Sequence, residues 1–295
     1  MENLAGKSAV VTGAGSGIGR SIALALAEQN VNVAVADIDQ EAADAVSREV
    51  AERGVKSFGM RSDVSKLADV QELADAAYDQ FGTVEILVNN AGVTLRPFRA
   101  SWDTSYEDFR WIMDVNFWGV LHGHMAFIPR MRETPGEKHI VNTSSMASVT
   151  SIAGHSAYSA SKAAVDGLSN AAREELKTQN IGLSLLHPGP VRTRIVSSER
   201  LRSEEEKSEN RGIKPWSDYV QNVGNAIIAG RAGKPTEDPD VATSPLEYIT
   251  PDDAGRLVVE GILGNKPHIL THPAPVDSLQ ERLDALLAGQ PQPAQ

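Results

Sequence analysis

The sequence predicts an α/β fold, a single doubly wound parallel sheet with helices on both of its faces. From Ser8 onward, short runs rich in β-branched residues alternate with stretches of helical periodicity. The strand-like runs are continuously apolar rather than alternately apolar and polar, which indicates strands that are buried on both faces. At 295 residues, the chain is long enough for one large domain with a sizeable core.

The predicted elements alternate along most of the chain. Thr250 and Pro251 are typical of a helix N-cap and first turn, and Gly289 is typical of a helix end. The first elements predict a βαβαβ unit, to which the rest of the sheet is added. The predicted strands cover residues 8–12, 31–37, 55–64, 84–90, 139–145, 181–189 and 268–272, and the predicted helices cover residues 18–29, 40–54, 66–81, 105–131, 156–178, 251–263 and 276–288.

Composition excludes several classes of protein. The chain has 28 Lys and Arg residues against 39 Asp and Glu residues, a formal charge of −11, so nucleic acid is not expected as a partner. The absence of Cys excludes disulfides, thiolate catalysis and Cys-ligated zinc. No stretch reaches the ~18 to 20 apolar residues of a membrane-spanning helix, and the N-terminus leaves no room for a signal peptide. We expect a soluble, cytoplasmic protein with no membrane partner.

We expect residues 1–290 to form a single domain that carries one long insertion. Residues 194–245 are first charge-rich and then rich in Gly and Pro, and long irregular segments of this kind are usually functional. The segment is therefore predicted to be a substrate lid, in which Trp216 and Tyr219 either seat the lid or touch the ligand. Residues 291–295 have no apolar face and are predicted to be a disordered tail.

A glycine-rich segment at 12–19, T-G-A-G-S-G-I-G, joins the first strand to the first helix. Glycines at such a turn let the backbone approach a pyrophosphate at the helix N-terminus. The string alone fits a turn without a ligand equally well, but its strand and helix flanks favour dinucleotide binding. The candidate cofactor-binding residues in this segment are Gly13, Ser16, Gly17, Ile18 and Gly19.

Asp37 ends the second strand, 18 residues beyond Gly19, where a carboxylate accepts hydrogen bonds from the adenosine ribose. A 2′-phosphate would be repelled there, and neither Ser16 nor Ile38 supplies the cation that NADP binding favours. The sequence therefore predicts NAD as the cofactor. The alternative interpretation is that Asp37 caps the next helix, as Asp39 is also placed to do.

Tyr158 and Lys162 are four residues apart in a predicted helix and so share one face. Such a pair can also arise by chance on an exposed surface. Ser145 favours a site, because it ends the run at 139–145, at the carboxyl edge where open α/β sheets bind ligands. Tyr158 could act as a general base if the Lys162 ammonium lowered its pKa from the ordinary ~10. The Ser145 hydroxyl could then hydrogen-bond the substrate oxygen.

By these residues and three further motifs, the chain resembles the NAD-dependent short-chain dehydrogenase/reductase family over about residues 4–193. Ser145 precedes Tyr158 by 13 residues, as the catalytic Ser does in that family. Its other motifs are matched by T-G-x-x-x-G-x-G at 12–19, N-N-A-G at 89–92, Asn116 in M-D-V-N-F-W-G, Tyr158 with Lys162, and P-G-x-V-x-T at 188–193.

The resemblance implies a Rossmann-type fold and a role for each matched residue. Tyr158 would be the general base, and Lys162 would lower its pKa and bind the ribose. Ser145 would orient the substrate oxygen, and Asn116 would complete a proton relay through a water. A homodimer or homotetramer built on the helices at 105–131 and 156–178 is also implied, and no metal. Further cofactor contacts would come from Asp63 and Val64 at the adenine, from Asn90 and Gly92, and from Val191 and Thr193 at the carboxamide.

Residues 194–245 match no motif of the family, so the substrate is less defined than the reaction. The runs at 192–202 and 264–273 are similar to bacterial members that oxidise a benzylic hydroxyl, the Cα-dehydrogenases of lignin-derived aryl ethers. We predict an NAD-dependent oxidoreductase that interconverts a secondary alcohol and a ketone on a bulky aromatic small molecule. The alternatives are a steroid-like or other bulky alicyclic alcohol as substrate, or a non-catalytic NAD-binding regulatory protein.

Several other residues have two interpretations. His122 and His124 point to different faces of a helix and so do not chelate one metal ion. His155 could face the substrate or the solvent. Two roles are possible for five further apolar residues, which could line a substrate pocket or pack in the core: Leu95, Phe98, Met146, Val149 and Ile152.

Overall fold

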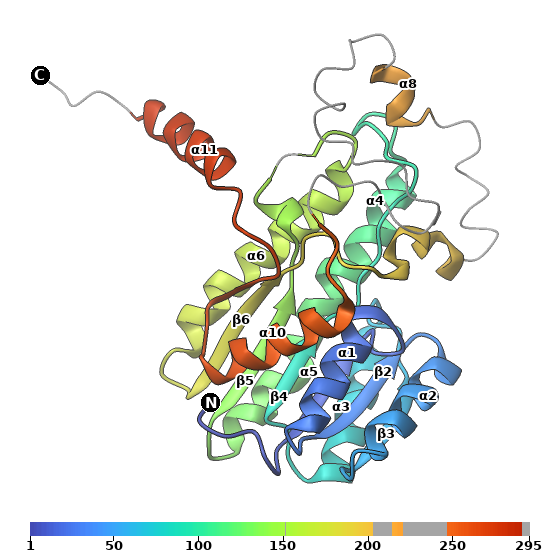
Figure 1. Cartoon of the computed structure of the whole chain (residues 1–295), viewed down its shortest axis with the longest axis vertical. Coiled ribbons are helices and arrows are strands. Elements are labelled where there is room, and N and C mark those ends of the chain that lie inside the picture. The colour runs from blue at the N-terminus through green and yellow to red at the C-terminus, as the bar shows by residue number, and fades with distance from the viewer. Residues whose placement is uncertain (151, 203–213, 221–246, 291–295) are drawn as a thin grey trace, which may run out of the picture.

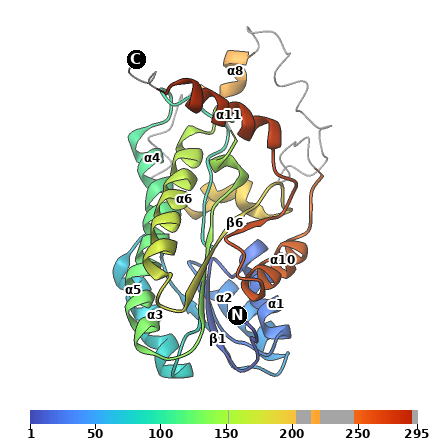
Figure 2. The same cartoon turned by 90° about the vertical axis from the view of Figure 1, so that its left-hand side faces the viewer.

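A seven-stranded parallel sheet forms the centre of the computed structural model, which describes residues 1–150, 152–202, 214–220 and 247–290. The strand order is β3-β2-β1-β4-β5-β6-β7, and helices cover both faces (Figures 1 and 2). The predicted doubly wound α/β fold is therefore confirmed. The strands are β1 (Ser8–Thr12), β2 (Asn32–Asp37), β3 (Ser57–Arg61), β4 (Ile86–Asn89), β5 (Lys138–Thr143), β6 (Ile181–His187) and β7 (His268–Leu270).

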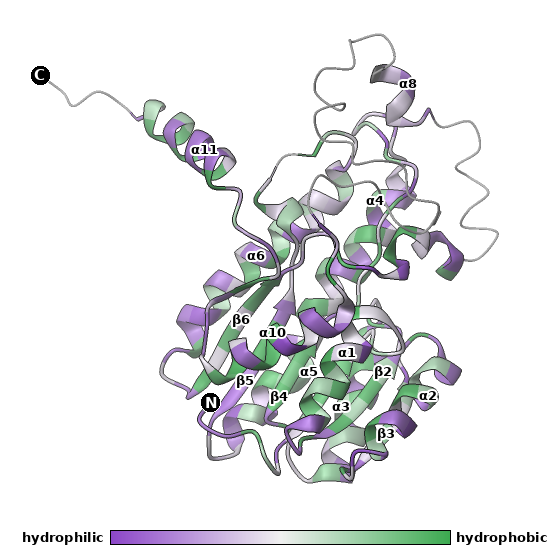
Figure 3. Cartoon of the chain, viewed as in Figure 1, coloured by the Kyte–Doolittle hydropathy of each residue, from purple (hydrophilic) through white to green (hydrophobic). Residues whose placement is uncertain are grey.

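Both faces of the sheet are buried in apolar clusters, and neighbouring residues of one strand belong to different clusters. In β1, Ala9 and Val11 join the cluster on one face, and Val10 joins the cluster on the other. This is why the strands are continuously apolar in sequence, as Figure 3 also shows. The first cluster includes residues of α1 (Gly17–Glu28), α2 (Gln40–Ala51) and α10 (Pro251–Leu263), and the second includes residues of α3 (Leu67–Phe81), α5 (Gly119–Glu133) and α6 (Ser156–Leu176).

The helix predicted at 105–131 is divided in two. α4 (Tyr106–Met113) leads into a π-helical turn, η1 (Asp114–Trp118), before α5 begins. The wider turn contains Asn116, which is fully buried and hydrogen-bonded to the backbone of Val93. Apolar periodicity does not reveal such a turn, because the turn shifts the helical register by only one residue.

The other predicted elements are present, with some ends shifted. β3 is five residues long rather than the predicted 55–64. The start of α10 is as predicted: Thr250 Oγ1 accepts a hydrogen bond from the backbone nitrogen of Asp253, and the Asp253 carboxylate accepts one from the backbone nitrogen of Thr250. Pro251 follows as the first helical residue, where its missing N–H costs nothing.

The described part of the predicted lid lies beyond the carboxyl edge of the sheet (Figure 1). Of the predicted lid at 194–245, the structure describes η3 (Arg194–Leu201), a 3₁₀ helix, and α8 (Trp216–Val220). Residues 203–213 and 221–245 of the predicted lid, and the tail predicted at 291–295, lie outside the described residues.

The last helix, α11 (Val276–Ala288), is present as predicted but covers no part of the sheet. It projects from the body of the molecule (Figures 1 and 2), and none of its residues is buried in the described structure. Among the described helices, none is both long enough and apolar enough to cross a membrane.

Candidate active site

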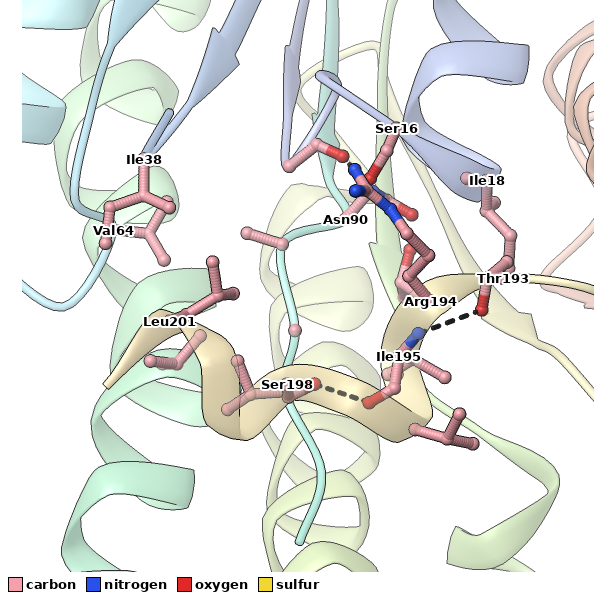
Figure 4. Close-up of a pocket in the computed structure, with 18 of the residues that line it drawn as sticks. Ser16, Ile18, Ile38, Val64, Asn90, Thr193, Arg194, Ile195, Ser198 and Leu201 are labelled. Atoms are coloured by element: carbon pink, nitrogen blue, oxygen red, sulfur yellow. Dashed lines mark hydrogen bonds between the residues drawn. The ribbon is translucent and has the colours of Figure 1, made fainter. Parts of the chain in front are cut away.

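A cavity of about 880 Å³ at the carboxyl edge of the sheet brings together residues from distant segments. The glycine-rich turn, the ends of β4 and β5, the start of α6 and the η3 segment all contribute to its wall (Figure 4). Most of the predicted site residues line it: Gly13, Ser16, Gly17, Ile18, Asp37, Asp63, Val64, Asn90, Gly92, Ser145, Tyr158, Lys162, Val191 and Thr193.

Two predicted site residues, Gly19 and Asn116, lie behind the cavity wall. A Cβ atom on Gly19 would come within 2.2 Å of the carbonyl oxygen of Gly13, so this glycine allows close packing of the turn. The Asn116 amide donates to the Val93 carbonyl oxygen and to Ser161 Oγ, both at 3.0 Å, and accepts from the Val93 nitrogen at 2.8 Å. Both residues support the wall from behind in the described structure.

The glycine-rich turn has the backbone shape of a phosphate cradle. Gly13 and Gly17 have φ values of +61° and +56°, in a region that side chains rarely tolerate. A Cβ atom on Gly13 would lie 2.7 Å from Cα of Ala91. The first turn of α1 carries no acidic residue, and the Ser16 side chain makes no capping hydrogen bond. The helix N-terminus can therefore attract a diphosphate, so the turn fits a dinucleotide.

Asp37 presents its carboxylate to the cavity from the end of β2. The carboxylate accepts hydrogen bonds from the backbone nitrogens of Gly15 at 2.8 Å and Asp39 at 3.1 Å. Asp39, rather than Asp37, caps α2, because the Asp39 side chain accepts from the backbone nitrogen of Ala42. The capping interpretation of Asp37 is therefore wrong, and its carboxylate lies beside the glycine-rich turn.

Asp63 and Val64 line the cavity after the end of β3. Burial acts to raise the pKa of Asp63, but hydrogen bonds from Ser65 and Lys66 outweigh it and lower the pKa. Figure 4 shows Val64 beside Ile38, and together they form an apolar part of the wall. This arrangement suits an adenine ring, because the carboxylate can accept a hydrogen bond from the adenine amino group and the apolar surface can pack against the face of the ring.

Tyr158 projects from the first turn of α6 into the cavity, which Ser145 also lines. Burial raises the pKa of the Tyr158 phenol, while the nearby Ser145 hydroxyl and the positive charge of Arg96 act to lower it. Ser145 Oγ also accepts a hydrogen bond from the backbone nitrogen of Ala147 at 3.1 Å, which orients the hydroxyl. The predicted Ser–Tyr pair is thus brought together by β5 and α6.

Lys162 lies one turn after Tyr158 and is almost completely buried. Its ammonium donates a hydrogen bond to the carbonyl oxygen of Thr143 at 2.9 Å and lies 5.7 Å from the centre of the Tyr158 ring. Burial lowers the pKa of Lys162 to about 8, although the charge of Asp166 acts to raise it. The chance surface pair considered above is therefore wrong, because both side chains face the cavity.

Sequence reasoning missed Arg96 and Tyr248, which also line the cavity. Arg96 lies four residues after Gly92, so its place just beyond the N-N-A-G motif at a strand end is a signal that could have found it. Tyr248 precedes α10 and carries no sequence signal of a site. Both residues reach the cavity from segments that lie far from Tyr158 in the sequence.

His155 is half-buried against Tyr158 and does not line the cavity. The two rings stack with their centres 4.5 Å apart and 12° between their planes. His155 Nε2 is also hydrogen-bonded to Thr94 Oγ1 at 3.0 Å. Burial lowers the pKa of His155 to about 3, assisted by the charge of Arg96, so the ring is neutral at neutral pH. Its stacking holds the plane of the Tyr158 ring.

The described cavity wall includes none of the five apolar residues considered for a substrate pocket, Leu95, Phe98, Met146, Val149 and Ile152. Leu95 instead packs with Val93 and Ile112 in a small core cluster. His122 and His124 are also engaged separately: His122 Nδ1 donates to the Val64 carbonyl oxygen, and His124 is hydrogen-bonded to Asn142.

Trp216 and Tyr219 seat α8 against the loop before α4. The backbone nitrogen of Trp216 donates a hydrogen bond to the Phe98 carbonyl oxygen at 2.6 Å. Trp102 donates through Nε1 to Tyr219 Oη at 3.3 Å, with the two rings 5.8 Å apart, and Tyr219 also bonds to Asp103. Of the two interpretations of these aromatic residues, the structural one is confirmed.

The η3 segment is held over the cavity at two points. Ser198 Oγ, within η3, accepts a hydrogen bond from the backbone nitrogen of Thr94 at 3.3 Å. Just past its end, Arg202 pairs with the fully buried Asp108 of α4 at 2.6 Å, and Asp108 pairs with Arg99 as well. The start of the predicted lid is therefore fixed to the body of the protein.

The fold and the site define an oxidoreductase family. The model of the family described as short chain dehydrogenase matches residues 7–204, and the chain belongs to this family. The predicted resemblance is thereby confirmed.

Individual relatives extend the similarity to whole structures. A short chain dehydrogenase/reductase from Burkholderia phymatum, solved in complex with NAD, is 34% identical, with a TM-score of 0.83 over 100% of this chain and 99% of that chain. LigO from Sphingobium sp. strain SYK-6 is 28% identical, with a TM-score of 0.74 over 99% of this chain and 93% of that chain. The 1-deoxy-11-beta-hydroxypentalenate dehydrogenase of Streptomyces exfoliatus is 34% identical over 194 residues, which are 66% of this chain and 70% of the relative.

Proposed function

We propose that this protein is an NAD-dependent dehydrogenase that interconverts a secondary alcohol and a ketone. The observation that carries the proposal is that Ser145, Tyr158 and Lys162 line one cavity together with the glycine-rich turn and Asp37. The Burkholderia phymatum relative supports the choice of cofactor, because it was solved with NAD. The position of Asp37 supports NAD over NADP, since a 2′-phosphate beside its carboxylate would be repelled.

In the oxidation direction, Tyr158 Oη removes the proton of the substrate hydroxyl. Ser145 Oγ donates a hydrogen bond to the same oxygen and holds it beside the phenol. The Lys162 ammonium lies close enough to favour the phenolate, and Asn116 keeps the loop at Val93 in place behind the wall. NAD, when bound, supplies the acceptor for the hydride that leaves the carbinol carbon.

For the substrate, we propose a bulky secondary alcohol with an aromatic ring, the benzylic class. The volume of the cavity supports a molecule of this size in addition to a cofactor. The similarity of the runs at 192–202 and 264–273 to bacterial Cα-dehydrogenases of lignin-derived aryl ethers supports the same choice. A bulky alicyclic alcohol is the second candidate, because the Streptomyces exfoliatus relative is described as acting on a hydroxypentalenate.

Three structural expectations belong to the same proposal. Residues 1–290 form one domain, residues 194–245 serve as a substrate lid, and the protein assembles as a homodimer or homotetramer. The contacts of η3 with Thr94 and Asp108 support the lid, because they fix its first turns beside the cavity.

The test is NADH absorbance with a panel of alcohols. The panel contains 1-phenylethanol and 1-(2-naphthyl)ethanol as benzylic alcohols, 2-decalol as an alicyclic one and 2-butanol as a small control. We expect NADH formation, with the highest kcat/KM for the bulky benzylic alcohol and the lowest for 2-butanol. The non-catalytic alternative would instead be supported if NAD binds but no alcohol leads to NADH formation and no ketone leads to NADH consumption.

A further inference from the structure

Arg96 is a half-buried cation in the cavity that the proposed mechanism does not use. Its guanidinium carbon lies 3.9 Å from the centre of the Phe98 ring, and Nη1 donates to the Leu95 carbonyl oxygen at 3.5 Å. No carboxylate of the described chain lies within 4.0 Å of it. Most of its donors are therefore left for a group that enters the cavity.

The groups around Arg96 are aromatic, and none of them is a carboxylate. Tyr158 and Tyr248 face the guanidinium, and burial raises the pKa of both phenols. His155 also faces it, and burial lowers the pKa of that ring to about 3. Phe98 completes the set. A cation in apolar surroundings without a counter-ion is unfavourable, so an anion that reaches it gains a strong interaction.

Two of the other five arginines that line the cavity differ in this respect. Arg202 is paired with Asp108 at 2.6 Å, and Arg110 is paired with Asp114 at 3.5 Å. Arg96 differs from both in having no carboxylate partner within the described chain, and it is the cavity arginine whose charge acts on Tyr158.

We propose that Arg96 binds a carboxylate of the substrate, so that the preferred substrate is a secondary alcohol that carries an acid group. The planar guanidinium can hold a carboxylate through two parallel hydrogen bonds and thereby set the position of the hydroxyl relative to Tyr158. This inference rests on the proposed dehydrogenase function, because it names the class of alcohol that the same site takes.

The test compares acids with their primary amides, which have nearly the same shape without the charge. The pairs are mandelate, 3-hydroxy-3-phenylpropanoate and 4-(1-hydroxyethyl)benzoate, each with its amide, so that the acid group lies at three distances from the hydroxyl. We expect kcat/KM in the native enzyme to be at least about ten-fold higher for one acid than for its amide. Preference for the amide in every pair would overturn the proposal.

The variants Arg96→Gln, Arg96→Lys and Arg110→Gln separate substrate binding from general electrostatics. Loss of Arg96 also raises the pKa of Tyr158 and so slows acids and amides alike, which is why the readout is the acid-to-amide ratio. We expect Arg96→Gln to lower this ratio at least ten-fold, Arg96→Lys to lower it less, and Arg110→Gln to leave it within two-fold. An equal fall of the ratio in Arg96→Gln and Arg110→Gln would contradict a specific contact. If Arg96→Gln does not fold, Arg96→Lys decides.

A binding measurement distinguishes failure of this inference from failure of the proposed function. Calorimetric titration of the enzyme mixed with NADH uses 4-acetylbenzoate and 4-acetylbenzamide. At least ten-fold tighter binding of the acid, lost in Arg96→Gln, supports the anion site even if no alcohol of any class is oxidised. Equal binding of the acid and the amide overturns it even if neutral alcohols are good substrates.

Discussion

Tyr158 has a setting in which burial and its neighbours oppose each other. Burial raises the pKa of the phenol, whereas Ser145 and Arg96 act to lower it. A Tyr with a raised pKa is protonated at neutral pH and cannot accept a proton, so the neighbours must outweigh burial when substrate is oxidised. The stacked ring of His155 contributes no charge to this balance at neutral pH, because burial lowers its pKa to about 3.

We expect Tyr158→Phe to reduce kcat at least about 100-fold while NAD still binds. The change removes the proton acceptor but leaves the ring to stack on His155, and general base catalysis contributes about 10² to 10⁴-fold. Steady-state rates and titration of NAD by protein fluorescence measure the two effects. Retention of more than a tenth of the native kcat would show that another group takes the proton.

Asp37 is expected to make the enzyme prefer NAD over NADP. Two unit charges ~4 Å apart repel by about 4 kcal/mol at an effective dielectric of 20, so kcat/KM should favour NAD by at least about ten-fold. Asp37→Ser should lower the ratio of kcat/KM with NAD to kcat/KM with NADP at least ten-fold. Asp39→Ser changes the cap of α2 instead and serves as the matched control. Equal efficiency of the native enzyme with both cofactors would refute the assignment.

At the scale of elements, one buried carboxylate joins α4 to the end of η3. Asp108 is fully buried and pairs with Arg99 from the loop before α4 and with Arg202 after η3. Arg202 in turn lies over the ring of Trp111, 4.8 Å from its centre. The position of the cavity wall formed by η3 thus depends on a contact between residues 94 positions apart.

Asp108→Asn should destabilise the protein by about 3 to 5 kcal/mol, because it leaves the buried Arg99 guanidinium without its counter-charge and leaves Arg202 with Glu199 alone. Urea unfolding measures the loss. Asp114→Asn is the control: it removes an exposed ion pair with Arg110 of the same helical region and should cost less than about 1 kcal/mol. Similar losses for the two variants would show that the buried pairs do not hold α4 and η3 together.

At the scale of the whole molecule, buried histidines make stability depend on pH. Burial lowers the pKa of His124 to about 4 and that of His139 to about 3. His124 Nε2 is hydrogen-bonded to the Asn142 amide, which suits a neutral ring. Below pH ~6.5 the unfolded chain takes up protons that these folded rings do not, so the free energy of unfolding decreases as the pH falls.

We expect stability to be lost progressively between about pH 6.5 and 4, with each buried His costing about 2 kcal/mol at pH 5. His124→Gln should reduce the slope of unfolding free energy against pH by up to about 1.4 kcal/mol per pH unit over this range. Ser169→Ala changes the same Asn142 contact without a titrating group and should leave the slope unchanged. An unchanged slope in His124→Gln would contradict a neutral buried ring.

Local sequence patterns were sufficient to predict the succession of strands and helices along the chain and the position of the glycine-rich turn. A helix or a turn is specified by residues within a few positions of one another, as Thr250 and Asp253 show at the start of α10. The division of the predicted helix at 105–131 was missed, because the π-helical turn depends on the contacts of Asn116 with Val93 and Ser161, which are distant in sequence.

The amino-acid sequence by itself determined the parallel sheet, the dinucleotide turn and the motif residues Ser145, Tyr158 and Lys162. Only the tertiary structure decided which remote side chains share the cavity with them. In the sequence, Arg96 and Tyr248 belong to no motif and would be typical of a protein surface. They become site residues because two loops meet at the carboxyl edge of the sheet. Periodicity and motif spacing report contacts between residues that are near one another in the sequence. The electrostatic environment of a bound substrate is instead set by the charges of all the segments that fold around the cavity.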